Sequence, residues 1–212
     1  MNIVENINII KNSIPSKVTL VVVSKMQSNS NILTAYNSGH RIFGENKVQE
    51  IQKKYKELPS DIKWHMIGHL QTNKVKYIAP FISLIHSVDS TKLLKEINKR
   101  AKENNRIINC LLQVHIAKEK TKYGFEMNDI EKIIKNSKDY TNVKISGIMG
   151  MATFTDKTKQ INKEFSQINT LFKKIFNNHI NILSIGMSND YKLAINHGSN
   201  MVRIGSAIFG KN

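Results

Sequence analysis

The 212-residue sequence contains a single cysteine, Cys110, and no long apolar run. One cysteine cannot form an internal disulfide, and its apolar neighbours predict a buried thiol in a strand. No stretch approaches the roughly 18 apolar residues of a membrane span, and residues 1–6 lack the basic start and apolar run of a signal peptide. We therefore expect a cytoplasmic protein built around one core.

Acidic residues are also scarce, because 16 of them accompany 32 lysines and arginines and leave a formal net charge of +16. Such a charge raises nucleic acid as a partner. The lysines are scattered at spacings that predict solvent-exposed helix faces, so we interpret the charge as compositional bias and expect no specific nucleic-acid site. These lysines include Lys53, Lys54, Lys56, Lys92, Lys95, Lys99, Lys132, Lys135, Lys173 and Lys174.

Strand-like and helix-like hydrophobic patterns alternate along the chain. Short apolar runs predict strands at residues 18–23, 41–44, 63–67, 81–87, 107–116, 143–149, 182–185 and 201–204. Helical spacing predicts helices at residues 1–13, 31–37, 45–57, 72–78, 91–104, 127–138, 158–177 and 190–197. This alternation predicts an α/β fold, namely a single (β/α)8 TIM-type barrel over residues 1–212 with an N-terminal helix. An open, doubly wound sheet is the alternative.

Lys25 ends the β-branched run of the first predicted strand. Ligands of parallel α/β proteins bind beyond the carboxyl ends of the strands, so an ammonium group there is placed for chemistry. A partly desolvated lysine loses proton affinity and becomes a nucleophile toward aldehydes. The alternative is a lysine that ends a strand and extends into water.

Two glycine-bearing turns follow the seventh and eighth predicted strands, at residues 185–190 and 203–206. Their backbone N–H groups and the Ser188 hydroxyl suit an anion, and barrels of this type bind phosphate at these two loops. The alternative is that Gly186 and Gly205 form ordinary turns and Ser188 and Ser206 cap helices.

A lysine opposite a phosphate site suits pyridoxal 5′-phosphate, which carries both an aldehyde and a phosphate. Arg203 lies where it could reach the ring nitrogen of that cofactor and keep it unprotonated. His65 and His69 are spaced as a metal pair would be on a helix, but they fall on a strand and a turn, so we expect no metal.

Eight segments, in order, resemble one known family: VVSK (22–25), FGENKVQE (43–50), WHMIGHLQTNK (64–74), HSVDS (86–90), KYG (122–124), GIM (147–149), IGMSND (185–190) and VRIG (202–205). They are similar to the pyridoxal phosphate homeostasis proteins of the YggS/PROSC type. The resemblance implies a barrel of fold type III, shared with the alanine racemase N-terminal domain. It also implies a cytoplasmic protein that carries or buffers the cofactor as an internal aldimine, without turnover of its own.

The resemblance further implies which residues bind the cofactor. Lys25 would be the Schiff-base lysine, Asn46 would line the pocket, and Arg203 would face the pyridine nitrogen. The phosphate would be held by Ser188, Gly205 and Ser206, in the turn that also contains Met187, and Lys122 would help to regulate or release the cofactor.

Two other functions stay open at this point. The first is a small racemase or decarboxylase of fold type III, which needs a second acid/base group, and Tyr123 is the one tyrosine in a plausible catalytic loop. Fold relatives that racemise amino acids complete their site with a further β-domain and a dimer partner, whereas we expect a monomer that supplies apo-enzymes. The second is a polyanion-binding protein without a cofactor.

Overall fold

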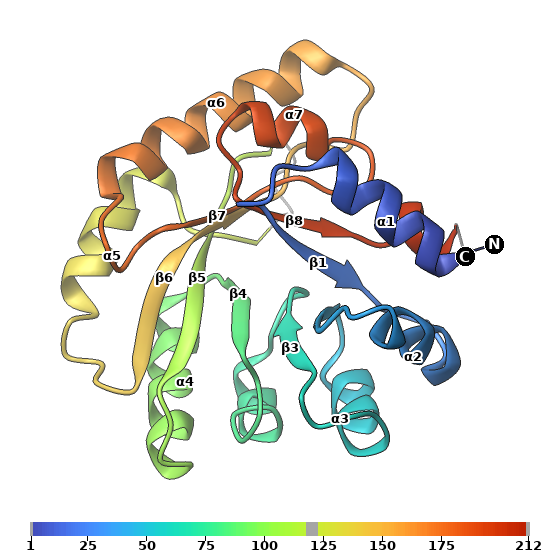
Figure 1. Ribbon diagram of the computed structural model, residues 1–212. Helices are drawn as coiled ribbons and strands as arrows, with labels where there is room; N and C mark the ends of the chain where they lie inside the picture. The colour runs from blue at the N-terminus through green and yellow to red at the C-terminus, as the bar shows by residue number, and fades with distance from the viewer. Residues whose placement is uncertain (1, 118–122, 211–212) are drawn as a thin grey trace.

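The computed structural model describes residues 2–117 and 123–210 (Figure 1). Within them, parallel strands close into a barrel in sequence order, because the first strand also pairs with the last. This confirms the predicted (β/α)8 fold and excludes the open sheet. The strands are β1 (Thr19–Val23), β2 (Ile42–Glu45), β3 (Lys63–Met66), β4 (Leu84–Val88), β5 (Ile108–Val114), β6 (Val143–Gly150), β7 (Ile182–Ser184) and β8 (Met201–Ile204).

Helices surround the barrel, as Figure 1 shows. They are α1 (Ile3–Ser13), α2 (Asn29–Asn37), α3 (Val48–Glu57), α4 (Thr91–Glu103), α5 (Ile130–Asn136), α6 (Thr158–Ile175), α7 (Tyr191–Asn196) and α8 (Ser206–Phe209). Two 3-10 helices, η1 (Thr72–Tyr77) and η2 (Met127–Asp129), replace a predicted α-helix and the start of another. The short helix α8 was not predicted; Asn6 of α1 donates through Nδ2 to its Ile208 carbonyl (2.9 Å).

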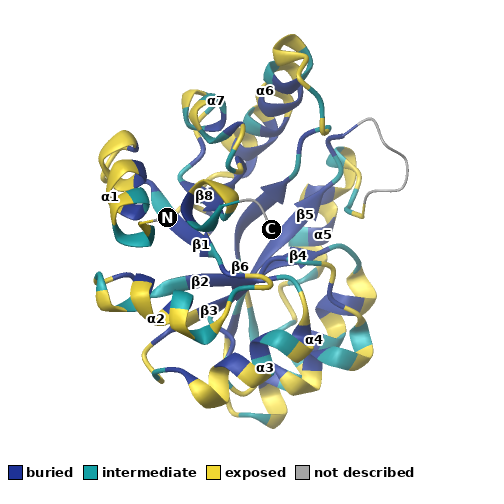
Figure 2. Ribbon diagram, turned by 90° about the vertical axis from the view of Figure 1, so that its right-hand side faces the viewer, coloured by how far each residue is buried: buried dark blue, intermediate teal, exposed yellow. Residues whose placement is uncertain are grey.

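The core has two layers, because side chains of a strand alternate between the inside of the barrel and the surrounding helices. The inner layer contains Val21, Leu84, Leu111, Met149 and Met201. A larger cluster fills the space between the strands and the inward faces of the helices, which Figure 2 shows as buried. Cys110 lies in this outer layer and is buried, as predicted.

The helices α1, α2 and α4 begin at a side chain that caps them. Asn2 accepts a hydrogen bond from the Glu5 backbone N–H and starts α1, and Ser90 accepts from the Leu93 N–H and starts α4. None of the helices in the described part of the chain is long and apolar enough to cross a membrane.

Candidate functional site

The segment that carries Lys25 forms a tight turn directly after β1. Lys25 and Met26 make up the turn, and Met26 adopts the left-handed region with φ 61°. Lys25 is exposed, which agrees with the alternative of a lysine that ends a strand and extends into water. The physical reason is that the turn places the residue two positions beyond the strand, outside the apolar interior of the barrel.

Three charged side chains beneath this turn form what we call the anchoring cluster: Glu45, Glu50 and Lys54. The Ser24 hydroxyl donates to Glu45 Oε1 (2.6 Å), and the Ser24 carbonyl accepts from Lys54 Nζ (2.8 Å). The Met26 backbone N–H donates to Glu50 Oε2 (2.9 Å). Because these contacts lie on both sides of the lysine between Ser24 and Met26, the cluster fixes the backbone of the turn.

The anchoring cluster is an ion-pair network that is largely shielded from water. Lys54 Nζ lies 2.8 Å from Glu45 Oε1 and 3.2 Å from Glu50 Oε2. Burial raises the pKa of Glu45, although hydrogen bonds from Lys54 and Ser24 act in the opposite direction. Burial also acts to raise the pKa of Glu50, but the hydrogen bonds from Met26 and Lys54 outweigh it and the pKa is lowered.

The prediction that Lys54 lies on a solvent-exposed helix face is wrong, because its side chain is buried. Two sequence signals could have found it. Lys54 follows the buried positions Val48 and Ile51 at three-residue steps along α3, which puts all three on one face. Glu45 is an acidic residue at the end of an apolar strand, and a buried carboxylate requires a cation or donors nearby.

Asn46 follows β2 at the same end of the barrel and is half-buried. Gly68, which follows β3, lies directly against its backbone. A Cβ at residue 68 would lie 2.4 Å from the Asn46 carbonyl oxygen and 2.7 Å from its Cα. Any side chain at this position would therefore displace Asn46, so the glycine is needed to place it.

The turns after β7 and β8 contact each other through Ser188. Its Oγ accepts from the backbone N–H groups of Gly205 (3.3 Å) and Ala207 (3.4 Å), so donors from the β8 turn converge on one point. Asp190 Oδ1 accepts from the Met187 N–H (2.5 Å), and this hydrogen bond stabilises the β7 turn. Burial raises the pKa of Asp190, against the effect of this hydrogen bond. The N–H groups of Gly205 and Ala207 therefore point to the place where the two turns meet.

Replacing Gly186 in the β7 turn by alanine is expected to destabilise the protein. Its φ is 97°, and a Cβ would lie 2.6 Å from the Ala194 Cβ and 2.9 Å from the Tyr191 Cα. Gly186→Ala should lower the free energy of unfolding by about 2–4 kcal/mol, from strain and overpacking together.

Gly39 provides the matched control, because its φ is 87° but no atom lies within 4 Å of the place that a Cβ would occupy. Gly39→Ala should cost about 1 kcal/mol, from backbone strain alone. Urea unfolding of both variants measures the difference. Equal losses would show that close packing at Gly186 is unimportant.

Arg203 lies inside the barrel near its carboxyl end. It pairs with Val21 of the inner core layer, and its guanidinium Nη1 donates to the carbonyl and the hydroxyl of Ser184 (both 2.7 Å). Its Nη2 donates to the Gly150 carbonyl (3.0 Å). Burial lowers the pKa of Arg203 to about 10, which still leaves it cationic at neutral pH. The last residues of β6 and β7 thus orient one buried cation.

The remaining predicted site residues have different placements. Met187 and Ser206 are exposed at the β7 and β8 turns. Lys122 lies outside the described residues. The structure therefore brings Lys25, Asn46, Arg203 and the two turns to one end of the barrel, which is the end expected for this fold.

A histidine–carboxylate pair, His69 and Asp89, lies at the same end of the barrel as these residues. His69 Nδ1 is 2.9 Å from Asp89 Oδ2, and these residues follow β3 and β4. The Tyr123 ring stacks on His69 with centroids 3.7 Å apart, and its carbonyl accepts from Gln113 Nε2 (2.9 Å). The sequence placed His69 on a turn, but did not indicate its two partners.

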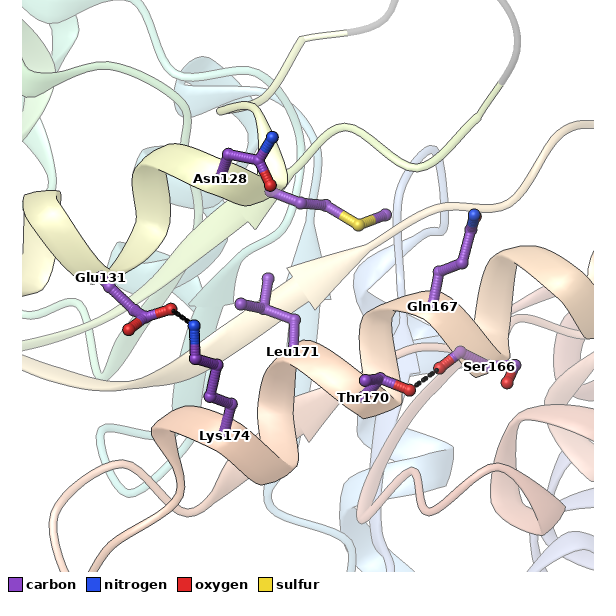
Figure 3. Close-up of a pocket in the computed structure, with 8 residues that line it drawn as sticks. Asn128, Glu131, Ser166, Gln167, Thr170, Leu171 and Lys174 are labelled. Atoms are coloured by element: carbon purple, nitrogen blue, oxygen red, sulfur yellow. Dashed lines mark hydrogen bonds and ion pairs between the residues drawn. The ribbon is translucent and has the colours of Figure 1, made fainter.

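A hollow of about 420 Å³ lies away from these strand ends, on the outside of the barrel (Figure 3). It is lined only by residues of η2, α5 and α6. Lys174 and Glu131 form an ion pair (2.5 Å) at its edge. The residues that line it are Met127, Asn128, Glu131, Ser166, Gln167, Thr170, Leu171 and Lys174. None of the predicted site residues lies there.

Comparison with known proteins identifies relatives over nearly the whole chain. The family model for the alanine racemase N-terminal domain matches residues 1–212. A pyridoxal phosphate homeostasis protein of Helicobacter pylori is 40% identical over 195 residues, which are 91% of this chain and 87% of the relative. The protein of that name from Aquifex aeolicus is 38% identical over 180 residues, which are 83% of this chain and 79% of the relative.

A solved structure shares both sequence and fold with this chain. PipY of Synechococcus elongatus, solved without PLP, superposes with a TM-score of 0.93 at 32% identity, covering 98% of this chain and 100% of PipY. The same protein solved with PLP bound gives a TM-score of 0.89. The chain therefore belongs to the alanine racemase N-terminal domain family and, within it, to the pyridoxal phosphate homeostasis proteins.

Proposed function

We propose that this protein binds pyridoxal 5′-phosphate, covalently through Lys25, and serves in the homeostasis of that cofactor. One observation carries the proposal, namely that β1 pairs directly with β8. A Cβ at Gly205 would lie 3.0 Å from the Val23 carbonyl oxygen, so the β8 turn lies against the end of β1. This proximity of the β8 turn to the strand that precedes Lys25 supports one ligand for the lysine and the two turns. The names of the relatives and the PLP-bound form of PipY support the same ligand.

The residues present fit the chemical groups of this cofactor. Pyridoxal phosphate supplies an aldehyde that forms a covalent bond with a primary amine. Lys25 is exposed and its backbone is fixed, so its amine can reach such a group. The N–H groups of Gly205 and Ala207, which converge on Ser188, suit the phosphate, together with the hydroxyl of Ser206.

The remaining assignments complete the proposed pocket. The permanent positive charge of Arg203 would lie toward the ring nitrogen and disfavour its protonation. Asn46, placed by Gly68, would line the other side, and Met187 belongs to the phosphate turn. We assign regulation or release of the cofactor to Lys122.

Chemical trapping tests the covalent assignment. Pyridoxal phosphate added to the purified protein, followed by borohydride reduction and mass mapping, should place the label on Lys25 and produce a visible absorption band before reduction. Lys47 is exposed after β2 and provides the control, so Lys47→Arg should leave the labelled peptide unchanged. Label spread over surface lysines, or no band at all, would contradict the assignment.

We also propose that the protein carries or buffers the cofactor without turnover, as a cytoplasmic monomer that supplies apo-enzymes and has no specific nucleic-acid partner. The alternative is a small racemase or decarboxylase, and His69 with Asp89 and Tyr123 would then be its acid/base groups. Exchange of the α-hydrogen of alanine for deuterium, measured on the loaded protein, decides between them. Exchange that His69→Gln abolishes would favour the enzyme.

A further inference from the structure

A chain of hydrogen bonds crosses the inside of the barrel from Arg203 to β3. Arg203 Nη1 donates to Ser184 Oγ (2.7 Å), and Ser184 Oγ lies 3.1 Å from His86 Nδ1. His86 Nε2 lies 3.1 Å from His65 Nδ1. The four residues come from β8, β7, β4 and β3 and are all buried. We call Ser184, His86 and His65 the interior relay.

Arg203 fixes one end of this relay. A guanidinium only donates, so Ser184 Oγ accepts from it and keeps its own hydrogen, for which His86 Nδ1 is the neighbouring acceptor. When Ser184 donates that hydrogen to Nδ1, a neutral His86 carries its proton on Nε2 and donates it to His65 Nδ1. In this arrangement each histidine has one tautomer, with its proton on Nε2.

The relay also explains how Arg203 keeps its charge available to the site. Its bonds go to neutral acceptors, the carbonyls of Ser184 and Gly150 and the Ser184 hydroxyl. The charge of Asp190 acts on Arg203 from a distance and raises its pKa, against the effect of burial, but within the described residues no carboxylate forms an ion pair with the guanidinium. These bonds use three of the five guanidinium N–H groups and so fix the plane of the guanidinium. The Nε–H and one Nη2–H take no part in these three bonds.

We propose that Ser184, His86 and His65 are positioning residues that fix the orientation of Arg203 and thereby set the electronic state of the ring nitrogen of bound pyridoxal phosphate. The inference rests on the proposed function. It goes further because it assigns a role to residues that contact Arg203 or each other rather than the cofactor. A relay of neutral groups orients the cation without offsetting its charge, which a carboxylate in the same place would do.

The first test needs no cofactor. Nitrogen-edited NMR of the histidine rings in the apoprotein should show His86 and His65 neutral and protonated on Nε2. Ser184→Ala removes the hydroxyl that bonds His86 Nδ1, and it should move the His86 ring resonances while the protein stays folded. A His86 proton on Nδ1, or resonances that Ser184→Ala leaves in place, would overturn the relay.

The second test uses the absorption spectrum of the loaded protein. Ser184→Ala and His86→Leu should each shift the visible band of bound pyridoxal phosphate and raise its Kd about tenfold, the usual effect of losing a group that orients a ligand-contacting residue. His86→Gln can accept and donate in the same directions, so it should restore most of the spectrum.

His40→Leu is the matched control, because His40 is also buried but bonds the Ile42 carbonyl outside the relay. It should lower stability and leave the band in place. An unchanged band in Ser184→Ala and His86→Leu would overturn the inference while the wild-type band still supported the proposed function. Absence of the wild-type band would instead overturn the proposed function, and the apoprotein NMR would still decide whether the relay exists.

Discussion

Replacing Lys54 by methionine is expected to lower the free energy of unfolding by about 3–5 kcal/mol. The ammonium is buried and donates to Glu45 Oε1 and to the Ser24 carbonyl, both at 2.8 Å. Methionine fills similar space without charge, so the Glu45 carboxylate would lose its cation. Its other oxygen, Oε2, already has no hydrogen-bond partner among the described residues. Urea unfolding of the apoprotein near neutral pH measures the loss.

An exposed lysine–glutamate pair provides the control that separates the effect of burial from the effect of losing a charge. Lys174 lies 2.5 Å from Glu131, but 67% and 52% of these side chains remain exposed. Lys174→Met should therefore cost less than about 1 kcal/mol. Adding Glu45→Gln to Lys54→Met should recover much of the lost stability, because the uncompensated carboxylate is removed. Equal losses in Lys54→Met and Lys174→Met would show that the anchoring cluster contributes no more than a surface ion pair.

The same substitution has a consequence for the proposed cofactor site. Lys54 holds the Ser24 carbonyl and also bonds Glu50, which in turn holds the Met26 N–H. Removing it releases the turn on both sides of Lys25. The borohydride-trapped label on Lys25 should then form more slowly, whereas Lys174→Met should leave its rate unchanged.

The barrel could be predicted from the sequence because each strand and helix carries its own local signal. The run of residues 201–204 is short, apolar apart from Arg203 and bounded by turn residues, and β8 has these bounds. The strand before Lys25 and the glycine turns after β7 and β8 were recognised in the same way. Alternation of strands and helices leaves few topologies, so the closed barrel follows from local patterns.

The interior of the site could not be predicted, because its contacts join residues far apart in the sequence. His86 and Ser184 are 98 positions apart, and Lys54 of α3 reaches Ser24, which follows β1. The exposure of Lys25 depends on the left-handed backbone of Met26, and methionine rarely adopts this conformation without support from its surroundings. Sequence patterns indicated which strand ends form the candidate site. The orientation of the side chains there depends on tertiary hydrogen bonds, which local patterns do not reveal.

Acidification is expected to destabilise the protein by about 4 kcal/mol per pH unit below about pH 6. Three histidines are buried, and burial lowers the pKa of His40 to about 4 and that of His65 to about 3. Burial lowers the pKa of His86 well below its usual range, and the neighbouring His65 and Arg203 act in the same direction.

The sign follows from comparing the two states. In the unfolded chain these histidines take up protons near pH 6.5, whereas in the folded chain they stay neutral to much lower pH. The unfolded state therefore binds more protons as the pH falls, and stability is lost from about pH 6.5 downward until the folded pKa values are reached. Each histidine contributes about 1.4 kcal/mol per pH unit in that window.

The carboxylates modify this trend at its acidic end. Glu50 has a lowered pKa, so its contribution to stability is lost in addition as the pH falls below about 4.5. Glu45 and Asp190 have raised pKa values, so their protonation in the folded state acts in the opposite direction. With a typical total stability of about 5–15 kcal/mol, we expect the histidines to dominate and unfolding to occur before most carboxylates titrate.

Urea unfolding of the apoprotein at several pH values between about 7 and 5 measures the slope directly. His86→Gln, His65→Gln and His40→Gln should each reduce the slope by about one third, whatever they do to the stability itself, because each removes one group that titrates only in the unfolded chain. His179 is exposed after α6, so His179→Gln should leave the slope as in the wild type. If the buried-site variants kept the wild-type slope, protonation of the unfolded histidines could not be the cause, and the interior relay would not be held neutral by the fold.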